Sequence, residues 1–179
     1  KRQLLHQPWR GESDTETLLA AIEAWGIEAS LHRFVGMFAL ALWDRRERVL
    51  YLARDRFGEK PLYWGWLHQS GRHVLGYGSD LAALRSLPGA DRPALDPSAL
   101  AAYLQLGCIP APLCIYSGIQ QLPPGCLLHI PAVCYGSPPH QLPEPRRWWD
   151  PVAQVSQLPQ TASLDDLHAV LEQACSRTA

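Results

Sequence analysis

The stretch from Phe34 to Trp66 constrains the fold most, because it contains the longest apolar run of the chain and two polar interruptions. Residues 34–43 contain one glycine and no charged residue, a pattern typical of a strand covered on both faces. The charged residues 44–47 then predict a hairpin turn, and residues 54–61, with a glycine and a proline, predict a second turn. We therefore expect a three-stranded antiparallel meander whose first strand is buried.

Outside this stretch, helical and extended patterns alternate, and together they predict an α+β fold class. Ser13 and Glu16 have the spacing of a capping box, in which each side chain bonds the other residue's backbone N–H. Asp96 and Pro97 place a capping residue before a proline at the first helical position. We expect helices over 13–25, 81–87, 98–106 and from 163 onward, and strands over 34–43, 49–53, 62–67, 73–77, 114–116 and 126–130.

The helix that begins near Ser13 is expected to pack one apolar face inward, because its large apolar residues recur at helical spacing. Gly26 follows as its carboxyl-terminal cap. The residues expected on the inward face are Leu18, Leu19, Ile22 and Trp25.

Composition indicates a globular chain, since 47% of the 179 residues are hydrophobic and 18% are charged. Sixteen Lys and Arg against seventeen Asp and Glu give a net charge of −1, so we expect neither a nucleic-acid partner nor a membrane-surface partner. The longest apolar run is shorter than the roughly 20 residues that cross a bilayer. Residues 1–17 lack the apolar core of a secretory signal. We expect a cytoplasmic protein.

No motif in the sequence predicts a metal site or a catalytic constellation by itself. The cysteine spacings fit no CxxC zinc pattern, and the seven histidines show no ligand spacing. No phosphate-binding loop, GxGxxG, HExxH or GxSxG motif is present. We expect free thiols with structural or incidental roles at Cys108, Cys114, Cys126, Cys134 and Cys175.

Two charged positions allow both a structural and a functional interpretation. Asp14 is a first-turn carboxylate that the helix dipole stabilises, or a carboxylate that binds a ligand. The cluster Arg54–Arg56 is a solvated or ion-paired turn, or part of a site. Residue spacing favours the structural interpretation in both cases and leaves the functional one open.

Segments spread over about residues 9–150 resemble the glutamine-dependent asparagine synthases and occur in the family's order. The family has Glu where this chain has Asp80, and often an aromatic residue where it has Cys108. Residues 131–145 have no counterpart that we can align. The segments that carry the resemblance are 13–16, 36–39, 42–44, 52–63, 78–81, 109–112, 115–119 and 122–125.

The resemblance implies an incomplete class II glutamine amidotransferase domain over residues 1–130. Its expected fold is the N-terminal-nucleophile (Ntn) hydrolase type, an α/β/β/α sandwich. A proline-rich linker is expected over 131–162, and 163–179 are expected to begin a second α/β domain, the ATP-dependent synthase domain. Because the chain starts at Lys1 and lacks a closing element, we expect a fragment.

In the family, a cysteine at the mature amino terminus attacks glutamine, with its own α-amine as base. The chain starts with Lys1, so the resemblance implies that no catalytic residue lies in it and that the fragment alone is inactive. Asp14 matches the family aspartate that receives the α-ammonium of glutamine. The released ammonia amidates aspartate, which ATP and Mg²⁺ have activated as an acyl-adenylate in the second domain.

The resemblance leaves two alternatives open. A glutamine-dependent amidotransferase of the same family could act on another carboxylate acceptor, or the chain could be a non-catalytic interaction module. The partners that the family implies are glutamine, aspartate and ATP, and a homodimer is left open.

Overall fold

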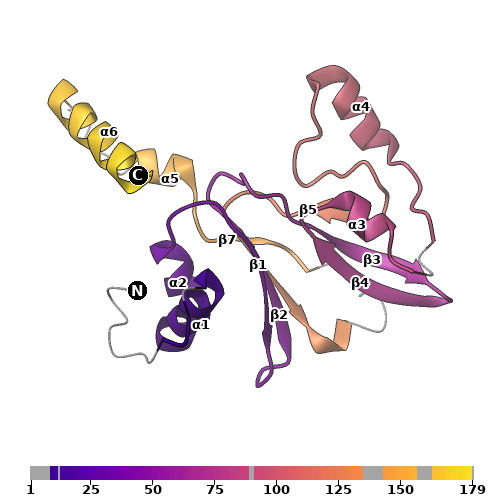
Figure 1. Cartoon of the computed structure of the whole chain (residues 1–179). Coiled ribbons are helices and arrows are strands. Elements are labelled where there is room, and N and C mark those ends of the chain that lie inside the picture. The colour runs from indigo at the N-terminus through magenta and orange to yellow at the C-terminus, as the bar shows by residue number, and fades with distance from the viewer. Residues whose placement is uncertain (1–8, 12, 89–90, 135–142, 157–162, 179) are drawn as a thin grey trace. The chain divides into compact units, whose positions relative to one another are not determined.

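The computed structural model describes residues 9–11, 13–88, 91–134, 143–156 and 163–178. The chain divides into two compact units, Lys1–Trp149 and Asp150–Ala179, which are described separately. Figure 1 shows the helices and strands of both units. Among the described residues, no helix has the length and apolar content needed to cross a membrane.

The first unit contains α1 (Asp14–Trp25), α2 (Ile27–Arg33), β1 (Ala39–Asp44), β2 (Val49–Arg54), β3 (Tyr63–Gln69), β4 (Arg72–Gly78), α3 (Leu81–Arg85), α4 (Pro97–Leu106), β5 (Ile119–Gln121), β6 (Cys126–Pro131), a short 3₁₀ helix (Ala132–Cys134) and β7 (Arg146–Arg147). The second unit contains α5 (Pro151–Ser156) and α6 (Leu164–Thr178). This mixture confirms the α+β class.

Two antiparallel sheets form the centre of the first unit. Sheet A has the order β1-β2-β6-β7, and sheet B has the order β4-β3-β5. In sheet A, Leu52 of β2 lies between Ala41 of β1 and Leu128 of β6. In sheet B, Gly65 of β3 lies between Gly76 of β4 and Ile119 of β5.

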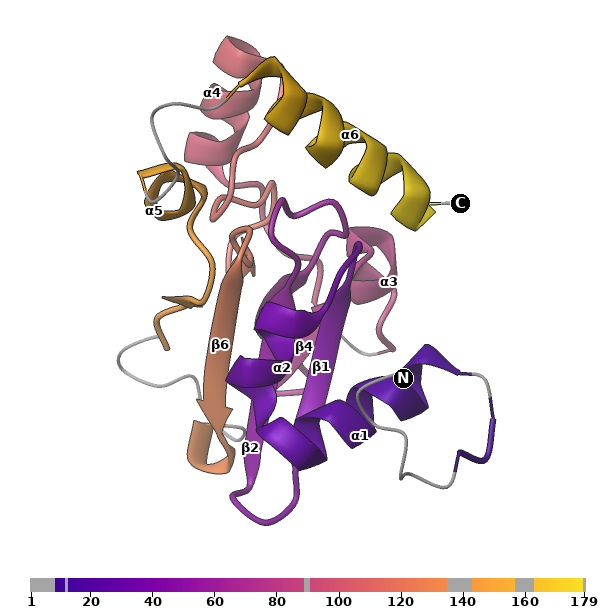
Figure 2. The same ribbon diagram turned by 90° about the vertical axis from the view of Figure 1, so that its left-hand side faces the viewer.

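The two faces of β2 bury different clusters, as the two-residue period of a strand requires. Leu50 and Leu52 join residues of β3 in the cluster between the sheets, whereas Ala53 joins Leu31 of α2 on the other face of sheet A. Figure 2 looks onto this second face, with α2 in front of the strands. The cluster between the sheets consists of Leu50, Leu52, Leu62, Trp64, Leu122, Cys126, Leu128 and Ile130.

A helix also packs on the outer face of sheet B. Leu67 of β3 forms a cluster there with Ile119 and Cys114, and Leu81 of α3 packs against it. A methyl group added at Gly76 would meet Leu84 of α3 at 3.4 Å, which shows how closely this helix approaches β4. The packing order is therefore helix, sheet, sheet and helix, consistent with the predicted sandwich.

The prediction of a buried first strand over residues 34–43 is wrong. The strand begins only at Ala39, and none of its six residues is buried, because β1 forms one edge of sheet A. Val35 and Met37 are 75% and 69% exposed in the segment before it. The strand buried on both faces is β2, in which only Tyr51 is not fully buried. An apolar run in the sequence does not by itself show that a strand is buried. Burial also depends on where the strand lies in the sheet.

The predicted meander is correct for its first hairpin and wrong for its third strand. β1 and β2 pair antiparallel as expected. On its other side, β2 pairs with β6 and not with β3. β3 belongs to sheet B, where it forms a hairpin with β4. Residues 55–62 are thus a crossover between two sheets.

Most of the predicted helices are confirmed, together with their caps. Gly26 ends α1 at φ 77°, and the Asp96 carboxylate accepts hydrogen bonds from Ser98 N and Ala99 N at the start of α4. On α1, however, Leu19 is 51% exposed and Ala21 is the buried residue, so the expected inward face is only partly correct. The helices α2 and α5 were not predicted, and the strand expected over 114–116 is only a single bridge between Leu95 and Tyr116.

Part of the predicted linker is ordered against the first unit. The strand β7 pairs with β6, and Trp148, only 8% exposed, packs with Leu31 and Ala53. Another part of this segment, 135–142, lies outside the described residues, as does 157–162. The domain boundaries at 130 and 162 stay a prediction.

A buried carboxylate organises the crossover between the sheets. Asp55 is 2% exposed. One of its oxygens accepts hydrogen bonds from Phe57 N and Glu59 N, each at 3.1 Å, and the other from Lys60 N at 3.0 Å and Phe38 N at 3.3 Å. One side chain thus holds both the crossover and the segment that leads into β1.

The neighbouring guanidinium holds the crossover against sheet B. Arg54, 6% exposed, donates from Nε to Lys60 O at 2.9 Å and from Nη1 to Leu122 O at 2.7 Å. It also donates to Gln121 Oε1 and to Gly58 O. The solvated interpretation of the Arg54–Arg56 cluster is therefore wrong for these two residues: the charges are buried and satisfied by backbone groups.

Replacing Asp55 with Asn should destabilise the protein by about 3 kcal/mol. The amide cannot accept all four hydrogen bonds, and the buried positive charge of Arg54 loses the negative charge next to it. Asp44→Asn is the matched control, since Asp44 accepts hydrogen bonds from Arg46 N and Glu47 N in an exposed turn. We expect about 1 kcal/mol for that change. Urea unfolding followed by tryptophan fluorescence measures both. Equal losses in the two variants would contradict the role of Asp55.

The stability should also depend on pH through Asp55. Burial alone raises the pKa of Asp55, but hydrogen bonds from Lys60, Glu59 and Phe38 outweigh it and leave the pKa lowered. The ionised carboxylate therefore stabilises the fold above about pH 4, the ordinary value, and this stability is lost as the pH falls toward the lower native pKa. Asp55→Asn should flatten this acid limb of the stability profile, whereas Asp44→Asn should retain it.

Gly65→Ala should disrupt the β3–β5 pairing. A methyl group at position 65 would lie 2.1 Å from Gly118 O and 2.9 Å from Ile119 Cα, and both are backbone atoms that cannot rotate away. Gly78→Ala on β4 is the control, because its nearest neighbour would be 3.9 Å away. We expect a loss of at least about 2 kcal/mol for Gly65→Ala and under 1 kcal/mol for the control. A Gly65→Ala variant as stable as the control would show that the strands are farther apart.

Candidate functional site

The candidate site lies at the amino-terminal end of α1, where Asp14 is the first helical residue. Ser13 caps the helix: its backbone is extended, and its Oγ accepts from Thr15 N at 3.2 Å. The Asp14 side chain is exposed. It takes part in no hydrogen bond or ion pair with another described residue, so its carboxylate is available to a ligand.

The carboxylate of Glu16 fixes the segment before Asp14. Its two oxygens accept hydrogen bonds from Arg10 N at 2.8 Å and Gly11 N at 3.0 Å. The predicted capping box placed these bonds differently, between Ser13 and Glu16 themselves. The N–H groups of Arg10 and Gly11, which precede the helix, occupy the Glu16 carboxylate instead.

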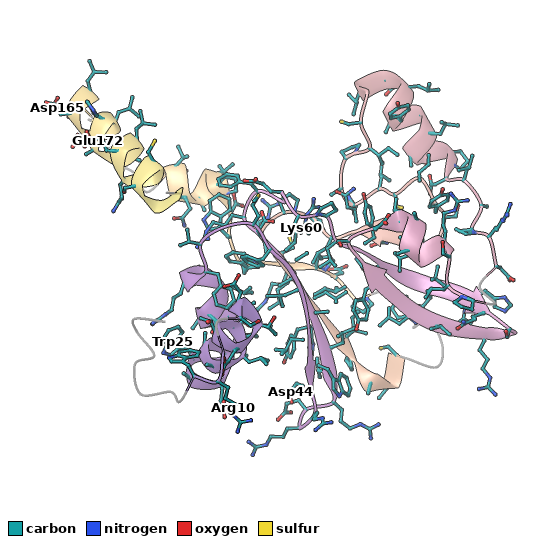
Figure 3. All side chains as sticks on the ribbon, in the orientation of Figure 1. Arg10, Trp25, Asp44, Lys60, Asp165 and Glu172 are labelled. Carbon is teal, nitrogen blue, oxygen red and sulfur yellow. The ribbon has the colours of Figure 1, made fainter. Side chains whose placement is uncertain are left out.

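Asp14 and the crossover between the sheets (residues 55–62) do not form one site. Figure 3 labels Arg10 beside α1 and Lys60 on the crossover, well separated in the same view, with Asp44 at the far end of the β1–β2 hairpin. The charges of Arg54 and Asp55 at the crossover face inward, to backbone groups. It supports the fold and offers no side chain of Arg54 or Asp55 to a substrate.

A separate cavity of about 440 Å³ opens beside sheet B. Its lining includes Trp66, His73, Asp96, Cys114, Ile119 and Gln120. Cys114 is the nucleophilic side chain among them, but it is 4% exposed and burial raises the pKa of its thiol. A buried neutral thiol is a poor nucleophile. The cavity therefore does not supply the attacking group of a glutaminase.

The cysteines are all free thiols, as expected. Burial also raises the pKa of Cys126, whose side chain belongs to the cluster between the sheets. Cys108 and Cys175 are exposed, and Cys134 is half-buried.

The described part of the chain has no group of three or more His, Cys, Asp or Glu placed to hold a metal ion. Near α1, Glu16 accepts hydrogen bonds from backbone N–H groups and Glu28 pairs with Arg146. These residues do not fit a magnesium–nucleotide site, which needs carboxylates and phosphate-binding donors together.

The role of Asp14 stays a prediction of the resemblance, and no sequence pattern predicted its surroundings. Glu16 was recognised as a capping residue, yet its bonds to Arg10 and Gly11 depend on the path of an irregular segment. The burial of Asp55 was also missed, although a carboxylate followed by Gly and Pro in a turn is a signal of side-chain-to-backbone bonding.

Comparison with known proteins supports the resemblance over most of the first unit. A family model described as a glutamine amidotransferase domain matches residues 1–136. A Mycobacterium tuberculosis protein named as an asparagine synthetase (glutamine-hydrolyzing) is 39% identical over 121 residues, which is 68% of this chain and 18% of the relative. Asparagine synthetase (glutamine-hydrolyzing) 1 of Bacillus subtilis is 32% identical over 114 residues, 64% of this chain and 17% of the relative.

The chain thus spans less than a fifth of the length of these curated relatives. The family model covers the strands β1 to β6 and the α1 segment with Asp14, and it extends over more than half of the chain. The chain belongs to the glutamine amidotransferase domain family.

Proposed function

We propose that this chain is part of the glutaminase domain of an ATP-dependent, glutamine-hydrolysing asparagine synthase. The observation that carries the proposal is the family match over residues 1–136, together with the names of the relatives. Two facing antiparallel sheets with helices on their outer faces are compatible with the finer proposal of an Ntn-hydrolase sandwich.

Within this domain, Asp14 receives the α-ammonium group of glutamine. An exposed carboxylate without a protein partner among the described residues suits this role, because a charge-assisted hydrogen bond to an ammonium needs an unoccupied acceptor. Glu16 keeps the Arg10–Gly11 segment beside Asp14, so the carboxylate is presented from a fixed backbone.

The remaining chemistry belongs to the complete protein. An amino-terminal cysteine outside this chain attacks the side-chain amide of glutamine, and the released ammonia passes to a synthetase domain. Bound there, Mg²⁺ and ATP supply the activation of the aspartate carboxylate. This division explains why none of the five thiols needs to be activated here. Cytoplasmic localisation fits these small-molecule substrates.

Asp14→Asn in the complete enzyme should raise the KM for glutamine about ten- to hundredfold, because the amide has no charge to pair with the α-ammonium. Synthesis from free ammonia should be spared. Glu23→Gln is the control, since Glu23 lies exposed on the same helix. Steady-state kinetics with glutamine and with ammonia separates the two activities. An unchanged KM for glutamine would remove Asp14 from the site.

Glu16→Gln should loosen the segment before Asp14, because one acceptor oxygen becomes an NH₂ group that faces a backbone N–H. We expect a loss of about 1 kcal/mol, the usual effect of a removed helix-end contact, and faster hydrogen exchange at Gly11. Glu23→Gln again serves as the control. If exchange at Gly11 stayed at the wild-type rate, Glu16 would not hold this segment.

A further inference from the structure

The helix α4 contains no charged residue, and large apolar side chains on it are exposed. Its sequence, PSALAAYLQL, has ten residues, all of them described, and only Ala99 is buried. The large apolar side chains are exposed by 41% at Leu100, 51% at Tyr103, 77% at Leu104 and 63% at Leu106. A helix whose surface is in contact with water normally carries charged residues on that surface. The helix α4 carries none.

The exposed side chains form one broad face. Positions 100, 103 and 104 are neighbours on a helix, being spaced by three and four residues, and position 106 follows position 103 by three residues. Ala99 borders this set, so the face continues from the covered side of the helix into the exposed side. Val133, which is 89% exposed, lies on the short 3₁₀ helix and is not part of this face. We call Leu100, Tyr103, Leu104 and Leu106 the α4 face. Contiguous exposed apolar surface of this kind marks an interaction site.

The base of α4 is held firmly, so the face is presented in a fixed orientation. Asp96 caps the helix through Ser98 N and Ala99 N, and its own N–H donates to Ile115 O at 2.9 Å. Just before it, Leu95 forms a bridge with Tyr116. A docking element that is already ordered loses little conformational entropy when it binds.

The composition of α4 excludes several classes of partner. Without Lys or Arg it offers nothing to phosphates or anionic lipid headgroups, which peripheral membrane helices and nucleic-acid-binding helices bind through basic residues. Without any charge it has no electrostatic means of choosing a partner. The partner surface is therefore apolar.

The size of the face favours a tethered partner over a second copy of the chain. A stable dimer buries about 800 Å² on each partner and uses roughly 20–30 residues. Four side chains on one helix are far fewer. A domain joined by the same polypeptide meets the face at an effective concentration of order millimolar, so a smaller contact suffices.

We propose that the α4 face docks against the synthetase domain of the same polypeptide. The inference rests on the proposed function, which places that domain outside this chain. The chain matches only 18% of its Mycobacterium tuberculosis relative, so the relative's length leaves ample room for such a domain. The contact fixes the glutaminase half of the enzyme relative to its synthetase half.

Hydrogen exchange of the full-length protein tests this contact. Leu104→Lys should raise exchange about tenfold in peptides of α4 and in one surface of the synthetase domain, because a buried ammonium weakens docking. Leu106→Lys should act in the same way and guards against local unfolding caused by one substitution. Val133→Lys is the matched control and should leave both regions unchanged. Glutaminase activity of each variant reports whether the domain is folded.

Three results would overturn the proposal. Exchange in the synthetase domain could stay at the wild-type level in both lysine variants. Exchange could rise only in α4. Light scattering could show that Leu104→Lys dissociates a dimer, which would make a second copy the occupant. The proposed function fails separately, if the wild-type protein shows no glutamine-dependent synthesis, and the exchange measurement does not depend on that activity.

Discussion

The buried pair of adjacent charges at the end of β2 is the interaction on which the first unit depends. Asp55 gathers the N–H groups of the crossover and of Phe38, while Arg54 reaches the carbonyl oxygens of Lys60 and Leu122. The crossover has to leave sheet A and enter sheet B within a few residues. It has no regular secondary structure to satisfy its backbone, and the two side chains supply those hydrogen bonds. Without them, the cluster between the sheets would not have a fixed geometry.

The same arrangement explains why the most recognisable stretch of the chain is not its site. Its two buried charged residues, Arg54 and Asp55, point inward to backbone groups. Some of its apolar residues, among them Leu50, Leu52 and Trp64, fill the space between the sheets. The candidate site lies instead at the start of α1, where an exposed carboxylate has no competing partner among the described residues. A structural pair has to be satisfied by the protein, whereas a binding carboxylate has to be left free for the ligand.

Local signals in the sequence predicted the local structure well. The caps at Asp96 and Gly26 set the ends of α4 and α1, because capping depends on residues adjacent in the chain. The errors arose where distant segments decide the outcome. The apolar run before Trp43 became an edge strand. In sheet A, β2 lies between β1 and β6, and no described strand pairs with the other side of β1. Likewise, the hydrogen bonds of Glu16 go to a segment whose path no periodicity describes. Asp14 could be identified only through the resemblance, because its exposure and first-turn position are shared by many helices.

We propose that this chain belongs to an enzyme that moves the amide nitrogen of glutamine onto aspartate. The most direct measurement supplies the full-length protein with glutamine labelled with ¹⁵N in the side-chain amide, together with aspartate, ATP and Mg²⁺, and follows the label by mass spectrometry. The account predicts ¹⁵N in the side chain of asparagine. Label that stays in glutamine, or that appears on a different carboxylate acceptor, would contradict it.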